Sequence, residues 1–219
     1  MMTSTFGTTV KVSIFGESHT PKIGCTIEGL PAGFTVDLDE LKTFLQRRSP
    51  SHPWDTPRKE TDDPQFISGI SAEGILDGSP LTVELPNTNV RPQDYAATNL
   101  IPRPGHADFS AWVKWGDSYK QTGGGHFSAR LTAPLCIAGG IALQILRVQG
   151  ITIAAHVLKI KDVNDTPLKL VDNSPEANKL LALQMDQLLQ ADPQALPFLD
   201  AQAGEKTRAL LMQLRSEKN

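Results

Sequence analysis

The fold of this chain depends on one stretch of sequence, HFSARLTAPLCIAGGIALQILRVQG, which occupies residues 126–150. Residues 126–148 predict one long helix, and Gly150 follows where a helix C-terminus commonly has glycine. Apolar side chains recur on every side of this helix, so it should lie in the middle of a protein or an assembly. Polar residues and a proline interrupt the apolar run, which leaves it short of the roughly 18 residues that span a membrane.

Shorter elements surround the predicted helix. Alternating apolar and polar residues, or β-branched runs, predict strands over residues 8–15, 24–28, 66–70, 81–85 and 151–160. Amphipathic patterns predict helices over residues 38–48, 174–190 and 200–216. Asp37 is a candidate N-cap for the first of these helices, with Glu40 as its capping-box partner. Residues 49–64 are rich in proline and charge, and form a long loop of the kind that often binds ligands.

The composition is that of a globular protein with a substantial core. The chain has 219 residues, of which 39% are hydrophobic and 21% are charged. A net charge of −3 and an aromatic content of 6% argue against a nucleic-acid partner, including an RNA-binding role. The N-terminus lacks the basic start and apolar run of a signal peptide. Cys25 and Cys136 have no disulfide-rich spacing, so we expect a cytoplasmic protein with reduced thiols and no membrane partner.

Two clusters that contain a histidine could carry proton chemistry. The first is GESHT (residues 16–20), where a strand ends and His19 enters a loop. A histidine held there can exchange protons near neutral pH, although a structural histidine fits the same pattern. The second is RPGHAD, in which a proline-glycine turn gathers Arg103, His106 and Asp108. Asp108 could orient the imidazole of His106 or cap a helix, and Arg103 suits a carboxylate or a phosphate.

A third cluster, GGGHFSAR, begins at Gly123 and leads into the long helix. Three glycines let backbone N–H groups approach a ligand and a helix N-terminus favours an anion, so a phosphate-binding loop and a flexible turn both fit. Ser128 and Arg130 favour the anion. Other basic residues lie in or beside irregular stretches: Arg47, Arg48, Arg58, Lys59 and Arg91. The five histidines lack metal-ligand spacing, so we expect no metal.

Taken in order, these clusters resemble the chorismate synthase family. The matching stretches include FGESH (15–19), GLPAG (29–33), the arginine pair at 47–48, RKE (58–60), NTN (87–89), RPGHAD and the triple glycine. The resemblance runs from about residue 5 to the end of the chain and thins after Val157. No single stretch is specific, but the combination is.

The resemblance implies an α+β fold, a β-α-β sandwich with central helices packed between sheets. Residues 1–219 would form the N-terminal part of a single domain, with the C-terminal half missing. The implied activity is a lyase that converts 5-enolpyruvylshikimate 3-phosphate to chorismate and phosphate by 1,4-elimination, the last step of the shikimate pathway. The implied cofactor is reduced FMN, with NADPH as a candidate reductant, and the implied full-length assembly is a homotetramer.

The same resemblance implies roles for individual residues. His19 would protonate the departing phosphate, and His106 would protonate or stabilise the reduced flavin. FMN would contact His126, Phe127 and Ser128. Arg48 would hold the anionic substrate or a pyridine nucleotide, and on chemical grounds Arg103 and Arg130 are further anion contacts.

The sequence departs from the family pattern in three places. HFS (126–128) stands where Arg-Ser-Ser is common, Thr122 where an arginine often precedes the glycines, and SHPW (51–54) where many members carry another arginine. Family members also continue well beyond the length of this chain. We therefore expect the chain alone to be inactive or nearly so. The alternative is a non-catalytic flavin- or anion-binding or assembly module derived from the enzyme.

Overall fold

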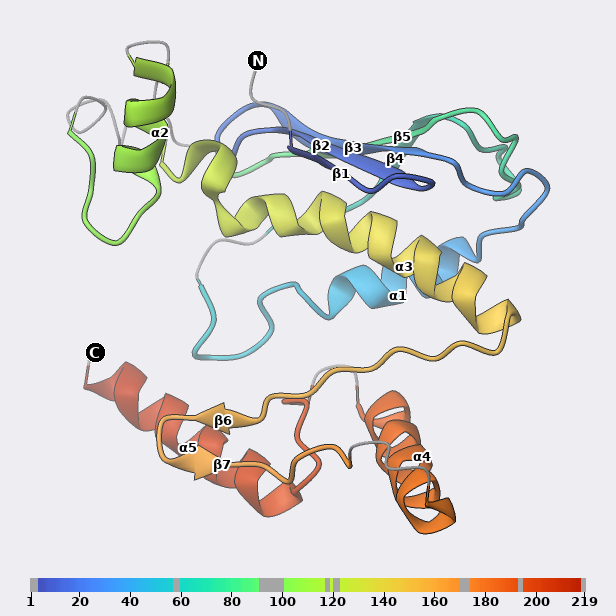
Figure 1. Cartoon of the computed structure of the whole chain (residues 1–219). Coiled ribbons are helices and arrows are strands. Elements are labelled where there is room, and N and C mark those ends of the chain that lie inside the picture. The colour runs from blue at the N-terminus through green and yellow to red at the C-terminus, as the bar shows by residue number, and fades with distance from the viewer. Residues whose placement is uncertain are drawn as a thin grey trace. The chain divides into compact units, whose positions relative to one another are not determined.

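The chain forms two compact units in its computed structural model, which describes residues 4–56, 60–90, 101–116, 119, 123–169, 174–192 and 195–217 (Figure 1). The first unit comprises residues 1–49 with 58–150, and the second comprises residues 50–57 with 151–219. The loop predicted over residues 49–64 therefore divides between the units, and its described residues contain no helix or strand. That the whole chain belongs to a single domain stays a prediction.

An antiparallel sheet forms one layer of the first unit (Figure 1). Its five strands are β1 (Ser4–Phe6), β2 (Lys11–Gly16), β3 (Lys22–Glu28), β4 (Gln65–Ser68) and β5 (Leu81–Pro86), in the spatial order β1-β2-β3-β5-β4. In the central strand β3, Cys25 pairs with Ile14 of β2 and with Val83 of β5. Four of these strands were predicted, with ends displaced by a few residues, because alternation of apolar residues is a local signal.

Two helices, α1 (Leu38–Gln46) and α3 (Thr132–Val148), lie against one face of this sheet (Figure 1). The core between the layers contains Ile23, Cys25, Leu41, Leu45, Leu81, Val83, Ile137 and Ile141, all at most 1% exposed. An antiparallel sheet with its helices gathered in a separate layer is an α+β arrangement, as predicted.

The cap of α1 confirms half of the predicted capping box. Asp37 accepts a hydrogen bond from the backbone N–H of Glu40 at 2.8 Å. The side chain of Glu40 instead pairs with Arg147 at the end of α3. The backbone N–H of Asp37 is satisfied by Gln144 Oε1 at 2.8 Å, so α3 supplies the second half of the cap.

The predicted start of α3 at residue 126 is wrong by six residues. Two short 3₁₀ turns, η3 (Gly125–Phe127) and η4 (Ala129–Leu131), precede the helix, and Ser128 between them is extended. Pro134 explains the difference, because it has no N–H for the carbonyl of Arg130 and its ring would clash there in a longer helix. Apolar periodicity continues through these turns and does not reveal the break.

By length and composition alone, residues 129–148 are apolar enough to cross a membrane. The sequence had instead predicted that this apolar run is too short to span one. Core helices of soluble proteins meet the same criterion. Here α3 packs against α1 and the sheet, and 44% of the apolar window is buried within the chain.

Close packing of α1 on α3 predicts opposite effects for two neighbouring glycines. A Cβ atom at Gly140 would lie 2.6 Å from Leu41 Cδ1, whereas one at Gly139 would meet nothing within 4 Å. Gly140→Ala should therefore lower the free energy of unfolding by about 1–3 kcal/mol. Gly139→Ala should raise it by about 0.5–1 kcal/mol, because alanine favours the helix. Urea denaturation measures both, and equal shifts in the same direction would contradict this packing.

The second unit contains a short hairpin and two helices. These are β6 (Lys159–Ile160), β7 (Val163–Asn164), α4 (Pro175–Gln190) and α5 (Ala201–Ser216), with Ser174 and Asp200 as helix caps. Both helices were predicted. The strand predicted over residues 151–160 is wrong except at its last two residues. A strand needs a paired neighbour, and Ile151 and Ile153 are exposed in a segment that pairs with no strand among the described residues.

Candidate active site

The turn that carries His19 meets the triple-glycine loop. Residues 17–20 follow β2, and Thr20 Oγ1 donates a hydrogen bond to the carbonyl of Glu17 at 2.8 Å. The backbone N–H of Ser18 donates to the carbonyl of Gly125 at 3.1 Å. Gly125 has a φ of 52°, a conformation that favours glycine. Two of the predicted clusters, more than a hundred residues apart in sequence, are therefore neighbours.

His126 is held from both sides of its ring. Its Nε2 lies 2.5 Å from Ser4 Oγ on β1, and its Nδ1 lies 3.4 Å from the carbonyl of Gly16 at the end of β2. A carbonyl oxygen only accepts, so Nδ1 is the donor in its contact with Gly16, whereas a serine hydroxyl can either donate to Nε2 or accept from it. This contact joins the glycine loop to the edge of the sheet. Ser4 was not recognised from the sequence, because nothing local connects it to residue 126.

A buried ion cluster lies beside these turns. Asp62 forms ion pairs with Arg48, at the end of α1, and with Arg130, in η4. The side chains of Asp62 and Arg130 are 2% and 5% exposed, and that of Arg48 is 21% exposed. Two guanidinium groups and one carboxylate leave a net charge of +1. Arg48 Nε and Arg130 Nη2 are buried and have no hydrogen-bond partner among the described residues, so donors remain for an anion.

Asn87 connects this cluster to the turn of His19. It follows β5, and its Oδ1 accepts from Arg130 Nε at 2.9 Å. Its Nδ2 donates to the carbonyl of Thr20 at 2.7 Å and to that of Glu17 at 3.3 Å. Asp62 and Asn87 were missed as site residues in the sequence. For Asp62, the only local indication in the sequence was a carboxylate inside a loop with basic residues.

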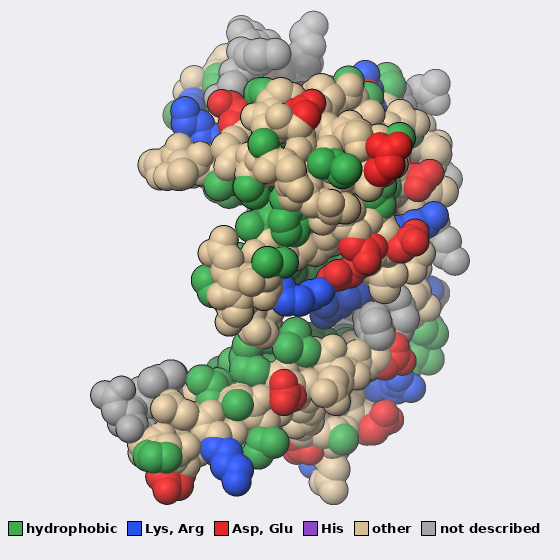
Figure 2. All heavy atoms as spheres, turned by 90° about the vertical axis from the view of Figure 1, so that its right-hand side faces the viewer, with side chains coloured by type: hydrophobic (Ala, Val, Ile, Leu, Met, Phe, Trp, Pro, Cys, Tyr) green, Lys and Arg blue, Asp and Glu red, His purple; other side chains and the backbone are tan. Residues whose placement is uncertain are grey.

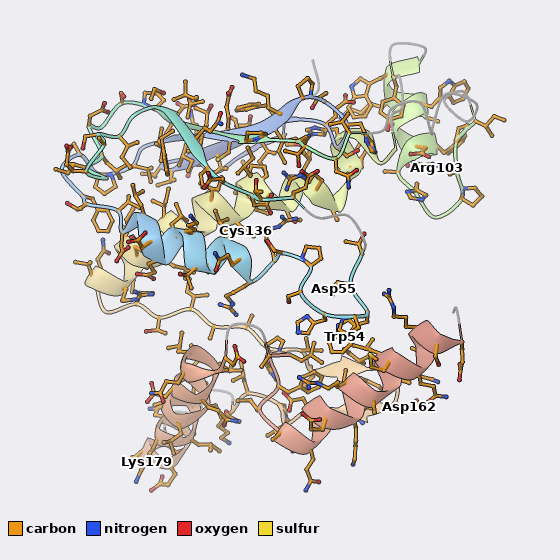
Figure 3. All side chains as sticks on the ribbon, turned by 180° about the vertical axis from the view of Figure 1, so that it is seen from behind. Trp54, Asp55, Arg103, Cys136, Asp162 and Lys179 are labelled. Atoms are coloured by element: carbon orange, nitrogen blue, oxygen red, sulfur yellow. The ribbon has the colours of Figure 1, made fainter. Side chains whose placement is uncertain are left out.

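The second predicted cluster also reaches the glycine loop. Arg103 lies beside the start of α2 (Asp108–Trp115), pairs with Asp108 at 2.8 Å and donates to the carbonyl of Gly123 at 2.6 Å (Figure 3). Asp108 thus orients a guanidinium group. The N-cap prediction for Asp108 is wrong, because the chain enters the helix through Ala107. His106 is exposed on the same turn, and its backbone N–H donates to the backbone carbonyl of Arg103.

Three aromatic rings gather next to the glycine loop. The centroids of Trp115, Tyr119 and Phe127 lie 6.1–6.2 Å apart in pairs, and Phe127 is 45% exposed. The hydroxyl of Tyr119 is buried without a hydrogen-bond partner among the described residues. Burial, with the charges of Asp108 and Glu17, raises the pKa of Tyr119. The phenol therefore stays protonated and can donate to a ligand.

Both cysteines are free thiols. Burial raises the pKa of Cys25 to about 12, so this thiol is inert at neutral pH. Cys136 lies on α3 (Figure 3), and burial also raises its pKa although Arg48 acts in the opposite direction.

The described residues contain no group of three or more potential metal ligands. Basic side chains on the face in Figure 2 lie among acidic ones instead of forming one basic field.

These features define a class: an α+β protein whose first unit gathers buried arginines and two histidine-containing turns around a glycine loop. Comparison with known proteins identifies the family. The family model described as chorismate synthase matches residues 10–219, and the chain belongs to this family. A crystal structure of a chorismate synthase matches 96% of the chain and 54% of its own length, with a TM-score of 0.63 and 22% identity, which shows the α+β fold.

Curated relatives agree. The chorismate synthase of Lancefieldella parvula is 87% identical over all 219 residues, which are 58% of its length. That of Aeropyrum pernix is 34% identical over 96% of this chain and 52% of its own. That of Thermococcus kodakarensis is 41% identical over 70% of this chain and 43% of its own. The matches thus cover 43–58% of the length of these relatives.

The outcome for the predicted site residues is uneven. The structure brings the turns of residues 19 and 126, and the pair Arg48 and Arg130, into one hydrogen-bonded network. Arg103 joins this network through the glycine loop. Arg58, Lys59, Arg91 and Thr122 lie outside the described residues. The individual roles of the site residues stay predictions.

Proposed function

We propose that this chain carries the anion-binding and proton-donating part of a chorismate synthase, a lyase that converts 5-enolpyruvylshikimate 3-phosphate to chorismate and phosphate. The observation that carries the proposal is the ion cluster of Arg48, Asp62 and Arg130, with its net positive charge and two free buried donors, tied to the turn of His19. A substrate with two carboxylates and a phosphate requires several such donors.

The proposed reaction breaks one C–O bond to phosphate and one ring C–H bond. The ring proton is released as the electron pair of the C–H bond enters the ring, the existing ring C=C bond shifts, and the phosphate leaves with the electron pair of the C–O bond. The net gain is one C=C bond, with no net oxidation. Arg48 and Arg130 bind the anionic groups, and Arg103, fixed by Asp108, is a further anion contact. His19 gives a proton to the departing phosphate, a contribution worth roughly 10²–10⁴-fold for a positioned acid. His106 acts toward the flavin, where it protonates or stabilises the reduced ring.

The aromatic cluster fits a flavin. Phe127 is 45% exposed, and the buried hydroxyl of Tyr119, which has no hydrogen-bond partner among the described residues, can donate to a ligand. His126 and Ser128 flank Phe127, and a Cβ atom at Gly124 would lie 2.9 Å from Ser128 Cβ, so the glycine keeps this loop compact. Reduced FMN, when bound, supplies electron density that assists the loss of phosphate.

The remaining expectations extend the same proposal. NADPH would be the reductant, with Arg48 as a contact for its phosphate groups. The protein would act in the cytoplasm, in the shikimate pathway of aromatic amino acid biosynthesis, and the full-length protein would assemble as a homotetramer. The net charge of −3 supports the expectation of no nucleic-acid partner.

One assay tests the proposal and the role of His19 together. A chimera that joins this chain to the part of the Lancefieldella parvula relative left uncovered by the match is supplied with reduced FMN and substrate without oxygen. We expect chorismate to form, and His19→Gln in the chimera to slow its formation by about 10²–10⁴-fold. The unjoined chain should show little or no turnover, because much of the site would be absent.

His52→Gln removes an imidazole that lies in the second unit and serves as the matched control, which should keep the activity of the chimera. Unchanged turnover in His19→Gln would remove His19 from the mechanism. A chimera that binds FMN but forms no chorismate would instead support a non-catalytic flavin- or anion-binding module.

A further inference from the structure

The side chain of Asn87 directly links the buried Arg130 to the turn of His19. The residue follows β5 and is 8% exposed. On one side its Oδ1 accepts from Arg130 Nε at 2.9 Å. On the other its Nδ2 donates to the carbonyls of Thr20 and Glu17 at 2.7 and 3.3 Å.

The chemistry of the partners fixes the orientation of this amide. A guanidinium group only donates hydrogen bonds, and backbone carbonyls only accept them. The oxygen of Asn87 must therefore face Arg130, and its nitrogen must face the turn. Aspartate would place an oxygen against two carbonyls, and an apolar side chain would leave buried groups unpaired on both sides.

The turn is also held by hydrogen bonds within itself and to the glycine loop. Its internal bonds join Glu17 and Thr20 to each other, and Ser18 bonds to the glycine loop. The backbone N–H of Asn87 donates to the carbonyl of Pro21 at 2.9 Å, so both the main chain and the side chain of Asn87 contact the segment that holds His19.

We propose that Asn87 is a positioning residue that sets His19 relative to the anion bound by Arg48 and Arg130. This inference rests on the proposed function. A proton donor must lie within hydrogen-bond reach of the departing oxygen, and a displacement of about 1 Å can cost roughly a hundredfold in rate. The amide of Asn87 keeps the donor and the anion site in one rigid unit.

The test uses the chain itself, with inorganic phosphate as the probe and the ring of His19 as the reporter. NMR spectra of the chain with ¹³C-labelled histidine contain ring signals from five histidines. The signal of His19 is the one that is missing from the spectrum of His19→Gln. Saturating phosphate should shift the His19 signal in the wild-type chain. In Asn87→Ala the shift should shrink by about fivefold or more, because the ring of His19 is no longer held at a fixed place relative to the bound anion.

Phosphate affinity separates positioning from a general loss of the site. In Asn87→Ala the dissociation constant, measured by calorimetry, should change by less than about threefold, because both guanidinium groups and the free donors remain. Asn89→Ala, two residues away at a position whose backbone N–H donates to Glu60 Oε1 at 3.4 Å, is the matched control and should behave as wild type. A full His19 shift in Asn87→Ala would overturn the proposal.

A second measurement keeps the inference testable without a ligand. Amide exchange of Ser18 and Thr20 should accelerate by roughly tenfold or more in Asn87→Ala and in Asn87→Asp, since each loses the donor to the turn. Asn87→Asp retains the acceptor for Arg130. If Asn87→Ala does not fold, the exchange measurement uses Asn87→Asp alone. Unchanged exchange overturns the inference. Failure of the wild-type chain to bind phosphate contradicts the proposed function instead.

Discussion

Replacing Asp62 by alanine is expected to lower the free energy of unfolding of the first unit by about 3–5 kcal/mol, because two buried guanidinium groups lose their counter-charge. The carboxylate of Asp62 is 2% exposed and pairs with both Arg48 and Arg130. Without it, Arg130 is left 5% exposed with a single neutral partner, Asn87.

Urea denaturation followed by tryptophan fluorescence measures this loss, since Trp112 and Trp115 belong to the first unit. Glu40→Ala is the matched control. It breaks the ion pair with Arg147, whose side chains are 37% and 63% exposed, and such surface pairs contribute at most about 1 kcal/mol. Similar losses in the two variants would show that the Asp62 cluster is not a buried charge network.

Phosphate should partly restore the Asp62→Ala variant. Two guanidinium groups without a carboxylate should bind an anion more tightly than two that share the carboxylate of Asp62. A ligand at a hundred times its dissociation constant stabilises the folded state by about 2.7 kcal/mol. Sodium chloride at matched ionic strength controls for screening. A variant that gains no more from phosphate than the wild type would show that the arginines do not form an anion site.

The elements that could be predicted from sequence are those defined by neighbours along the chain. The cap of α1 at Asp37 and the alternation of β2 and β5 depend on residues within a few positions of one another. The start of α3 was misplaced because Pro134 acts on backbone geometry, to which apolar periodicity is blind. The strand over residues 151–160 failed because strand pairing is a long-range property.

In the site, too, features that depend on neighbouring residues could be predicted, and contacts between distant residues could not. The clusters at His19, Arg103 and Gly123 were found because chemically active residues stand together in the sequence. Their meeting through Ser18, Gly123 and Gly125 could not be derived without the fold or the resemblance. Asp62 lies 68 residues from Arg130 and Asn87 lies 43 from it, so no local pattern could have joined them.

Asp165 is expected to stabilise the second unit as Asp62 stabilises the first, because both are buried carboxylates that accept several hydrogen bonds or ion pairs. Its carboxylate is fully buried and accepts hydrogen bonds from the backbone N–H groups of Leu199 and Asp200 and from His156, at 2.7–2.8 Å. Asp165→Ala is expected to lower the free energy of unfolding of this unit by about 3–5 kcal/mol, because three donors lose one buried acceptor.

The effect should depend on pH in a defined direction. Burial alone would raise the pKa of Asp165, but the hydrogen bonds from Leu199, Asp200 and His156 outweigh it, and the pKa is lowered. A lowered carboxyl pKa in the folded state stabilises the protein above the unfolded-state value, near 3.9. This stabilisation is lost as the pH falls through the folded-state pKa, so wild type and Asp165→Ala should converge in acid.

Hydrogen exchange of the backbone amide of Thr207, a buried residue inside α5, measures the opening free energy of this unit. Asp162→Ala removes an exposed carboxylate from the neighbouring hairpin turn (Figure 3) and is the matched control, with an expected change within about 0.5 kcal/mol. If Asp165→Ala opens no more readily than Asp162→Ala at neutral pH, the backbone of residues 199–200 is held by contacts other than this carboxylate, and the acid sensitivity of the unit must arise elsewhere.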